Sequence, residues 1–332
     1  MSHFTVAVIT KGRPTYEKIE EALAPFQENN MDDCPKRFLA FHSLSKEYKE
    51  AYDTGTTERV RLKDGTLVYS WDDCLYEEVT EEEYEAAKAE GRKTAYSSYP
   101  KPTYKAKKDL TAIGAEIVQI PWKELYFTFK EYLEDYHDAK FDEEMQDYGY
   151  WENPNAKWDW YQVGGRWAGS LRVAPDCENC GLGEKSWGWG KQNPYETDGK
   201  YKKVDSARIK DLVFPDYQER YEKAKRFWEL KVEGQEPKND QEKEDLSWDF
   251  YKTSYYENTY KDKETYAECE ATFHTYAVID KEGHWHAQGE MGLFGITIGA
   301  EDTLVDYIKN YKKNVFDAAG DDDYITIVDC HI

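Results

Sequence analysis

Long apolar segments are missing from this sequence. No run of residues approaches the roughly 18–20 that a membrane-spanning helix requires, and the first residues, Met1 to Thr5, lack the basic-then-apolar order of a signal peptide. Cysteine is sparse as well, because six cysteines among 332 residues cannot supply the disulfide framework typical of small secreted domains. These absences predict a protein that works in the cytoplasm and has no membrane partner.

Positive charge is also scarce. The chain has 44 lysines and arginines against 67 aspartates and glutamates, which gives a formal net charge of −23. Such a chain is poorly suited to neutralise phosphates, so we do not expect it to bind duplex nucleic acid directly. The motifs G-x-S-x-G and H-E-x-x-H, the P-loop and the Rossmann glycine pattern are absent, which disfavours a familiar hydrolase, nucleoside triphosphatase or dehydrogenase.

Aromatic residues and clustered acids are what the sequence has in excess. Tyr, Phe and Trp together make up 16% of the chain, enough to build a core although hydrophobic residues reach only 39%. Residues 72–90 and 131–152 each carry a net charge of −8, whereas residues 199–231 carry +4. The acidic segments are either solvated helix faces or a surface that imitates nucleic-acid phosphates and occupies a partner protein with a basic surface.

The two ends of the chain predict matching pieces of one fold. Residues 4–9 form a continuous apolar run typical of a central strand, and Thr15 can cap an amphipathic helix directly after it. Near the other end, the patterns predict two hairpin strands, a helix over 302–317 and a closing strand at 324–328. The predicted fold class is therefore α+β: a mixed sheet with ferredoxin-like β-α and ββαβ units at the two ends, which makes the chain termini neighbours.

The predicted domain organisation places the middle of the chain between these ends. Residues 1–175 and 271–332 together form one α+β core, and residues 176–270 form a large, mainly helical insertion with loops. Within that insertion, residues 233–245 are polar enough to predict a mobile loop. Residues 94–109, with two prolines and a small basic cluster, predict an exposed linker.

The segment 153–169, NPNAKWDWYQVGGRWAG, contains the candidate ligand-binding residues. Two glycines before an arginine allow close approach of the backbone, and a guanidinium can hold phosphate or carboxylate through two parallel hydrogen bonds. Neighbouring aromatic rings can stack on a nucleotide base. The candidate residues are Trp158, Asp159, Tyr161, Gly164, Gly165, Arg166 and Trp167. The alternative is that the rings are core residues and that Arg166 forms an ion pair with an acid such as Asp159.

A second group of candidates lies near the C-terminus. His284 and His286 are two apart on a predicted strand and therefore share a face. If the closing strand pairs nearby, four side chains can meet as catalytic acid–base groups or metal ligands. These four residues are His286, Glu290, Asp329 and His331. The alternative is a pair of exposed edge-strand histidines and an ordinary tail.

Cys177 and Cys180 have the C-x-x-C spacing of metal ligands. No second C-x-x-C follows, so a zinc site would need a distant histidine to complete it. The other interpretation is that these residues are reduced thiols in a surface turn. A structural zinc ion is thus the one cofactor that the sequence suggests, and the cofactor is otherwise unknown.

Several short segments of the sequence resemble those of an uncharacterised group of proteins carried by bacteriophages, prophages and plasmids. The matching segments are HFTVAVI (3–9), LAPF (23–26), the centre NPNAKWDWYQVGGRW (153–167), GEMG (289–292) and the C-terminal VDCHI (328–332). No activity is established for this group. The resemblance therefore implies a mobile genetic element in a bacterial host as the setting, and it implies no mechanism.

These observations leave three functional hypotheses. The favoured one is an acidic, cytoplasmic mobile-element protein that binds a host factor with a basic surface, for counter-defence or by nucleic-acid mimicry. The second is an enzyme that processes a nucleotide or another small anion in a pocket around Arg166 and His331. The third is a virion or structural component. Whether the chain catalyses a reaction is left open by its sequence.

Overall fold

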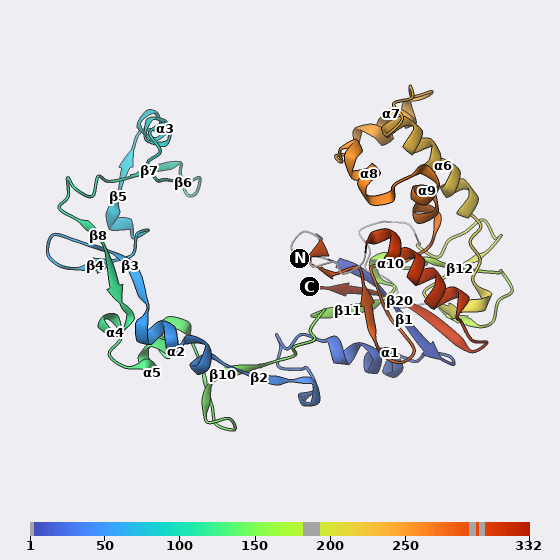
Figure 1. Cartoon of the computed structure of the whole chain (residues 1–332), viewed down its shortest axis with the longest axis horizontal. Coiled ribbons are helices and arrows are strands. Elements are labelled where there is room, and N and C mark those ends of the chain that lie inside the picture. The colour runs from blue at the N-terminus through green and yellow to red at the C-terminus, as the bar shows by residue number, and fades with distance from the viewer. Residues whose placement is uncertain (1–2, 182–192, 292–296, 299–302) are drawn as a thin grey trace. The chain divides into compact units, whose positions relative to one another are not determined.

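The chain folds into two compact units. The computed structural model describes residues 3–181, 193–291, 297–298 and 303–332. Unit 1 consists of residues Met1–Ala40 and Glu152–Ile332, and unit 2 consists of residues Phe41–Trp151 (Figure 1). The predicted division was different. It placed residues 41–151 in the α+β core and set residues 176–270 apart as an insertion.

Unit 1 contains a large central sheet with helices on it. Its strands are β1 (His3–Lys11), β11 (Trp160–Val163), β12 (Leu171–Val173), β13 (Cys180–Gly181), β14 (Lys202–Val204), β15 (Ser206–Arg208), β16 (Ala277–Ile279), β17 (Trp285–Ala287), β18 (Glu290–Met291), β19 (Thr297–Ile298) and β20 (Asp323–His331). Its α-helices are α1 (Tyr16–Leu23), α6 (Tyr217–Lys231), α7 (Asp240–Ser247), α8 (Thr253–Tyr260), α9 (Lys263–Ala271) and α10 (Leu304–Tyr311). Shorter helical turns are η1 (Ala24–Phe26), η2 (Lys36–Phe38), η5 (Gly165–Trp167), η6 (Ile209–Asp211) and η8 (Lys312–Asp317).

The central sheet has the strand order β13-β15-β20-β1-β16-β17, and β11 also pairs with β20. β1 and β20 run antiparallel along their whole length, from His3 opposite His331 to Lys11 opposite Asp323, and β1 pairs with β16 in parallel. A central strand covered on both faces needs apolar residues in succession, which explains the run at residues 4–9. The prediction that the chain ends are neighbouring strands is confirmed.

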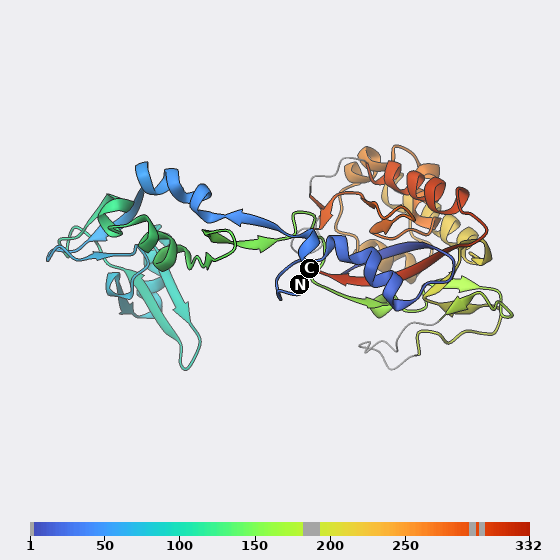
Figure 2. The same ribbon diagram turned by 90° about the horizontal axis from the view of Figure 1, so that it is seen from below.

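Helices cover both faces of this sheet (Figure 2). On one face, Val6 and Val8 pack with α1. On the other, Ala7 and Ile9 pack with α6, α8, α9 and α10, because successive side chains of a strand point to opposite faces. The α+β class is confirmed. The ferredoxin-like arrangement is not confirmed, because α1 and α10 lie on opposite faces instead of sharing one.

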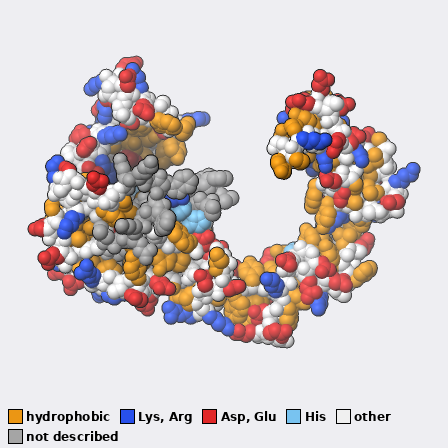
Figure 3. Space-filling view, turned by 180° about the vertical axis from the view of Figure 1, so that it is seen from behind, with side chains coloured by type: hydrophobic (Ala, Val, Ile, Leu, Met, Phe, Trp, Pro, Cys, Tyr) orange, Lys and Arg blue, Asp and Glu red, His pale blue; other side chains and the backbone are white. Residues whose placement is uncertain are grey.

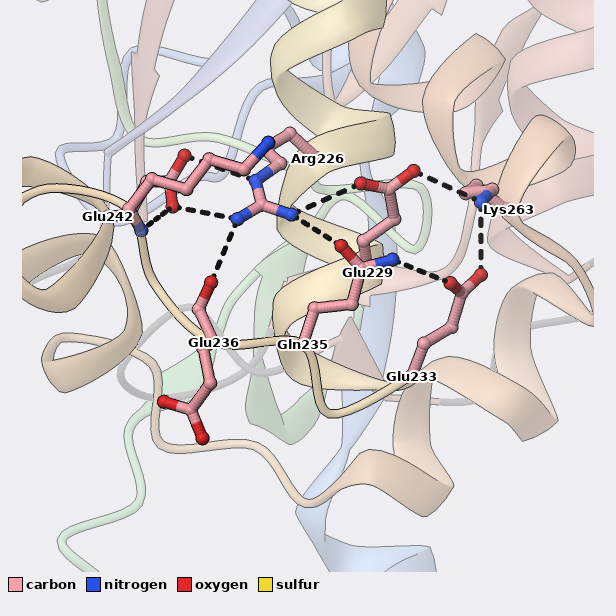
Figure 4. Close-up of polar contacts among 8 residues, drawn as sticks. Arg226, Glu229, Glu233, Gln235, Glu236, Glu242 and Lys263 are labelled. Carbon is pink, nitrogen blue, oxygen red and sulfur yellow. Dashed lines mark hydrogen bonds and ion pairs between the residues drawn. The ribbon is translucent and has the colours of Figure 1, made fainter.

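The segment predicted to be a mobile loop, residues 233–245, is held by a charged network around Arg226 (Figure 4). The Arg226 guanidinium donates to both carboxylate oxygens of Glu242, at 3.1 and 3.0 Å, and to the side-chain oxygen of Gln235 at 2.7 Å. Helix α7 begins inside the segment, with Asn239 as its N-cap. The loop prediction is wrong for residues 240–245, which belong to α7. Residues 233–239 are a loop, and Arg226 holds it through hydrogen bonds to Gln235 and to the carbonyl of Glu236.

Unit 2 contains two three-stranded sheets, with strand orders β4-β3-β8 and β5-β7-β6. Its strands are β3 (Thr56–Arg61), β4 (Leu67–Val68), β5 (Tyr76–Val79), β6 (Thr94–Ser97), β7 (Thr103–Lys107), β8 (Glu116–Pro121) and β9 (Phe141–Asp142). Its helices are α2 (Leu44–Thr54), η3 (Asp73–Leu75), α3 (Glu81–Ala89), α4 (Trp122–Leu125), α5 (Phe129–Glu131) and η4 (Tyr132–Tyr136). A third sheet, β2-β10-β9, includes the two strands at the unit boundaries, β2 (Ala40–Ser43) and β10 (Asp147–Glu152).

Aromatic side chains form much of the core of unit 2. Tyr52, Trp122 and Tyr132 are buried together. The guanidinium carbon of the buried Arg59 lies 4.0 Å from the ring centroid of Tyr69, so the ring face compensates part of the cost of burying a charge. In the described ranges of both units, no helix combines the length and the apolar character that crossing a bilayer requires.

The predicted linker at residues 94–109 is wrong. The segment contains β6 and β7, which pair antiparallel with each other, and β7 also pairs with β5. Its prolines, Pro100 and Pro102, lie in the connection between the two strands, where a missing backbone donor does no harm to the sheet.

Candidate functional site

The last residues of β20 meet the first residues of β1 at one end of the central sheet. The antiparallel register places His3 directly opposite His331, and Asp329 is two residues earlier on β20. Val328 and Cys330, which alternate with them, point into the core beneath α1. Two histidines and an aspartate are therefore brought to the same end and the same face of the sheet.

Asp329 and His3 form the first histidine–carboxylate pair. The Asp329 side chain is almost fully buried; its Oδ1 lies 2.8 Å from Nδ1 of His3, and its Oδ2 accepts a hydrogen bond from the backbone N–H of Arg166 at 2.9 Å. Gly165 makes this approach possible, because its φ is +51° and a Cβ there would lie 2.3 Å from the Cβ of Asp329. The second glycine of the G-G-R-W turn is therefore required for the turn to reach the buried carboxylate.

His331 and Asp159 form the second pair. Nδ1 of His331 lies 2.6 Å from Oδ1 of Asp159, and the backbone N–H of Asp159 donates to the carbonyl of His331 at 2.9 Å. The ring centroids of His3 and His331 are 5.0 Å apart, with 71° between the ring planes. A carboxylate at Nδ1 favours the tautomer that carries its proton there, so Nε2 of each ring is left to accept or transfer a proton.

A third aspartate, Asp205, anchors the other side of the turn. It is fully buried; Oδ1 accepts a hydrogen bond from the backbone N–H of Gly169, and Oδ2 accepts one from the hydroxyl of Tyr195, both at 2.6 Å. A Cβ on Gly164, whose φ is +73°, would lie 2.5 Å from Oδ2. Burial and the hydrogen bond to Asp205 raise the pKa of Tyr195, which keeps its hydroxyl a donor. The G-G-R-W turn is thus held from both sides by buried carboxylates.

The side chain of Arg166 is exposed. The alternative in which it pairs with Asp159 is wrong, because Asp159 pairs with His331. Among the residues that the structure describes, no acid forms an ion pair with the Arg166 guanidinium. This guanidinium is therefore available to an anion from solution.

Most aromatic residues of the same segment are core residues. Trp158 is buried, and its Nε1–H donates to a backbone carbonyl of α1 at 3.1 Å. Tyr161 packs beside it, with ring centroids 5.2 Å apart, whereas Trp167 packs against the core on the opposite face of the sheet. These three rings are divided between two cores and do not line a common pocket. The half-exposed Trp160, 6.1 Å from the ring of His3, is the aromatic side chain at the site.

The predicted catalytic cluster is only partly assembled. Asp329 and His331 lie together, but His286 belongs to β17, which β1 and β16 separate from β20 in the sheet. Nε2 of His286 instead lies 2.7 Å from a carboxylate oxygen of Asp280. The backbone of Glu290 belongs to β18, and its side chain lies outside the described residues.

Cys177 and Cys180 lie at the edge of the sheet, where the Cys180 thiol donates to the carbonyl of Cys177 at 3.3 Å. Burial raises the pKa of the Cys177 thiol, which keeps it protonated in the metal-free protein. Within the described ranges, neither cysteine belongs to a group of three or more side chains that could hold a metal ion. The geometry gives the predicted structural zinc site no support.

Sequence reasoning did not select His3, Asp159 as a histidine partner, or Asp205. His3 carried a usable signal, because antiparallel pairing of the two terminal strands places it opposite His331. Asp205 carried none, since its importance depends on how Gly169 and Tyr195 fold back onto it.

Comparison of the chain with models of protein families, with curated proteins and with solved structures found no match. The function is therefore inferred from the arrangement of this chain's own residues.

Proposed function

We propose that unit 1 binds a small anion at the His3–His331 end of its sheet, with a phosphate group, as in a nucleotide, as the ligand of best fit, and that the two imidazoles exchange protons with it. The observation that carries this proposal is the pair of imidazoles 5.0 Å apart, each with its own carboxylate at Nδ1. Such carboxylates orient the rings and leave Nε2 for acid–base chemistry. A neutral ring accepts a proton from the ligand at Nε2, and a protonated ring donates one to it.

Arg166 supplies the fixed positive charge of the proposed site. Its backbone N–H bonds to the same carboxylate that holds His3, so the backbone of Arg166 lies beside the His3–Asp329 pair, and its side chain is exposed. A planar guanidinium can donate two parallel hydrogen bonds to a phosphate. The half-exposed ring of Trp160 beside His3 offers a face on which a nucleotide base can stack.

The two histidine–carboxylate pairs also tie the two chain ends together, so their role could be purely structural. In that case the histidines would not respond to an added anion. Titration of the full chain with inorganic phosphate and with adenosine monophosphate, followed through the imidazole NMR signals, separates the two roles. We expect saturable shifts of the His3 and His331 signals, and at least about tenfold weaker binding in Arg166→Ala, because a charge-assisted hydrogen bond is lost. Arg37→Ala, which removes another exposed arginine of unit 1, is the matched control and should bind as the wild type.

A purely structural role would leave the His3 and His331 signals unchanged by either ligand. Under that role, His331→Gln would lower the melting temperature, and Arg166→Ala would have no effect on any measured quantity. These outcomes would exclude the anion site.

A second candidate function, binding of a basic host protein, is favoured by the surface of unit 2. Eight of the nine acids in residues 72–90 are exposed, four of them in the first half of α3. Trp71, Tyr99 and Phe127 are exposed in the same unit, and Figure 3 shows hydrophobic side chains among the acidic ones at its surface. Exposed aromatic residues combined with charge are typical of protein-binding surfaces. This surface therefore supports the partner-binding hypothesis, although a solvated helix face has the same acids.

Charge reversal at matched positions tests this second function. One variant combines Glu81→Lys, Glu82→Lys and Glu85→Lys in α3. The control combines Glu17→Lys, Glu20→Lys and Glu21→Lys in α1, where the acids are also exposed. Each is used to capture proteins from host lysate at low salt, where charged association is strongest. We expect the wild type and the α1 variant to retain the same basic protein and the α3 variant to lose it. Equal retention by all three would exclude α3 as the binding surface.

A further inference from the structure

The hairpin between β16 and β17 holds the side chain of Asp280 in one orientation. The turn closes through hydrogen bonds from the Gly283 N–H to the Asp280 carbonyl (2.9 Å) and from the Asp280 N–H to the His284 carbonyl (3.0 Å). The carboxylate oxygen Oδ1 of Asp280 accepts from the backbone N–H groups of Glu282 (3.0 Å) and His284 (2.9 Å). Because the turn engages Oδ1, the other oxygen, Oδ2, is left for side chains.

Oδ2 of Asp280 faces two imidazole nitrogens. Nε2 of His286 lies 2.7 Å from it, and Nδ1 of His284 lies 3.3 Å from it. One possible ligand atom from each of the three side chains lies within 4.8 Å of those of the other two. Oδ2 of Asp280 is therefore the point on which both imidazole side chains converge.

We infer that Asp280, His284 and His286 form a binding site for a divalent transition-metal ion, with zinc as the best match. Two imidazole nitrogens and one carboxylate oxygen are the donors of open zinc sites, in which water or another ligand takes the fourth position. Tetrahedral bonds of about 2.0–2.2 Å separate neighbouring donors by about 3.3 Å. The His284 nitrogen already has this separation from Oδ2, and the His286 nitrogen is roughly 0.6 Å closer to Oδ2 than this. The ligand atoms of the two imidazoles lie within 4.8 Å of each other, so rotation of these exposed side chains brings all three donors to one ion.

The surroundings suit an open site. The side chains of His284, His286 and Asp280 are 71%, 51% and 30% exposed, so an ion reaches all three donors without unfolding the hairpin. The neighbouring cation, Lys281, is paired with Asp323 at 3.0 Å, which offsets its charge. Asp280 and His286 also line a cavity of about 490 Å³ between the hairpin and α10. A water molecule or small ligand in this cavity can complete the coordination.

Zinc titration of the full chain tests this inference. Isothermal titration calorimetry should show one zinc ion per chain, and His286→Ala and Asp280→Asn should each weaken binding by at least about tenfold. His284→Ala should do the same without changing the melting temperature of the metal-free protein, because the side chain is exposed. His42→Ala is the matched control, since His42 also pairs with a carboxylate, that of Glu47 at 2.6 Å, and this variant should bind zinc as the wild type does.

Two further variants separate this site from others in the chain. Cys177→Ser should leave zinc affinity unchanged if the hairpin holds the ion. Arg166→Ala should also leave it unchanged, so failure of the anion site and failure of the metal site are distinguishable. The inference is overturned if the wild type binds no zinc up to about 1 mM. It is overturned equally if the three hairpin substitutions leave zinc binding intact and Cys177→Ser abolishes it.

Discussion

The two histidine–carboxylate clusters of unit 1 lie on the same sheet but share their carboxylates differently. At the sheet end, His3 and His331 each have an aspartate of their own, and all four side chains are at most 21% exposed. On the hairpin, His284 and His286 face a single oxygen of Asp280 and are 71% and 51% exposed. Two separate partners orient two rings independently, which suits proton transfer, whereas one shared oxygen makes three donors converge, which suits a metal ion.

The backbone is the origin of this difference. The sheet-end cluster combines residues 3, 159, 329 and 331, which only strand pairing and the G-G-R-W turn bring together. The hairpin cluster comes from residues 280–286 and forms with one local turn. Substitutions at the sheet end should therefore affect the stability of the whole unit, and matched substitutions on the hairpin should affect it little.

Gly165→Ala should have the largest effect. The added Cβ would lie 2.3 Å from the Cβ of Asp329 at a φ of +51°, so the turn must shift, and we expect the free energy of unfolding to fall by about 3 kcal/mol or more. Gly283→Ala is the hairpin control, because its φ is +88° but no atom lies within 4 Å of the added Cβ; it should lose only about 1 kcal/mol. Chemical denaturation measures both. Equal losses of unfolding free energy in the two variants would contradict the conclusion that the G-G-R-W turn is more tightly constrained than the hairpin turn.

Asp329→Asn should have the next largest effect. An asparagine replaces one of the two carboxylate oxygens with an N–H2 group, either the one that accepts from the Arg166 N–H or the one that faces Nδ1 of His3. It also removes the buried negative charge, so we expect a loss of about 2 kcal/mol in the free energy of unfolding. Asp280→Asn changes a more exposed pair and should cost less than about 1 kcal/mol. Thermal and chemical denaturation of both variants measure the two losses. A larger loss in Asp280→Asn than in Asp329→Asn would refute the prediction.

A smaller effect should appear in the acid range through Asp280. Its pKa in the folded protein is lowered from the ordinary value of 3.8, so the unfolded chain takes up this proton more readily than the folded one. The carboxylate therefore contributes its full stabilisation above the unfolded pKa and loses it as the pH falls through the lower folded pKa. Stability measured from about pH 5 to about pH 2 should fall less steeply in Asp280→Asn than in the wild type. Identical slopes would show that Asp280 is not held as described.

The pairing of the terminal strands was easier to predict from the sequence than the boundaries of the two units. The apolar runs at both ends directly indicate neighbouring strands, and β1 and β20 are paired over their whole length. The unit boundaries were not predictable, because residues 41–151 and 176–270 are similarly polar and aromatic. The second segment packs on the sheet through side chains such as Trp228 and Tyr266, which charged neighbours surround in the sequence.

The candidate site was half predictable for a related reason. Asp329 and His331 alternate with the buried Val328 and Cys330, a pattern that sequence alone reveals. The importance of the two glycines was also predictable, but the groups that come close to them were not: an added Cβ at Gly164 or Gly165 would meet the buried carboxylates of Asp205 and Asp329. Contacts between distant segments decide such roles, and no local pattern encodes them.

NMR of the imidazole nitrogens in the metal-free full chain, titrated first with phosphate and then with zinc, tests most directly whether the two clusters have different functions. The account predicts that phosphate shifts the signals of His3 and His331 and leaves those of His284 and His286 unchanged, and that zinc does the reverse. Phosphate and zinc acting on the same pair of histidines, or neither pair responding, would contradict it.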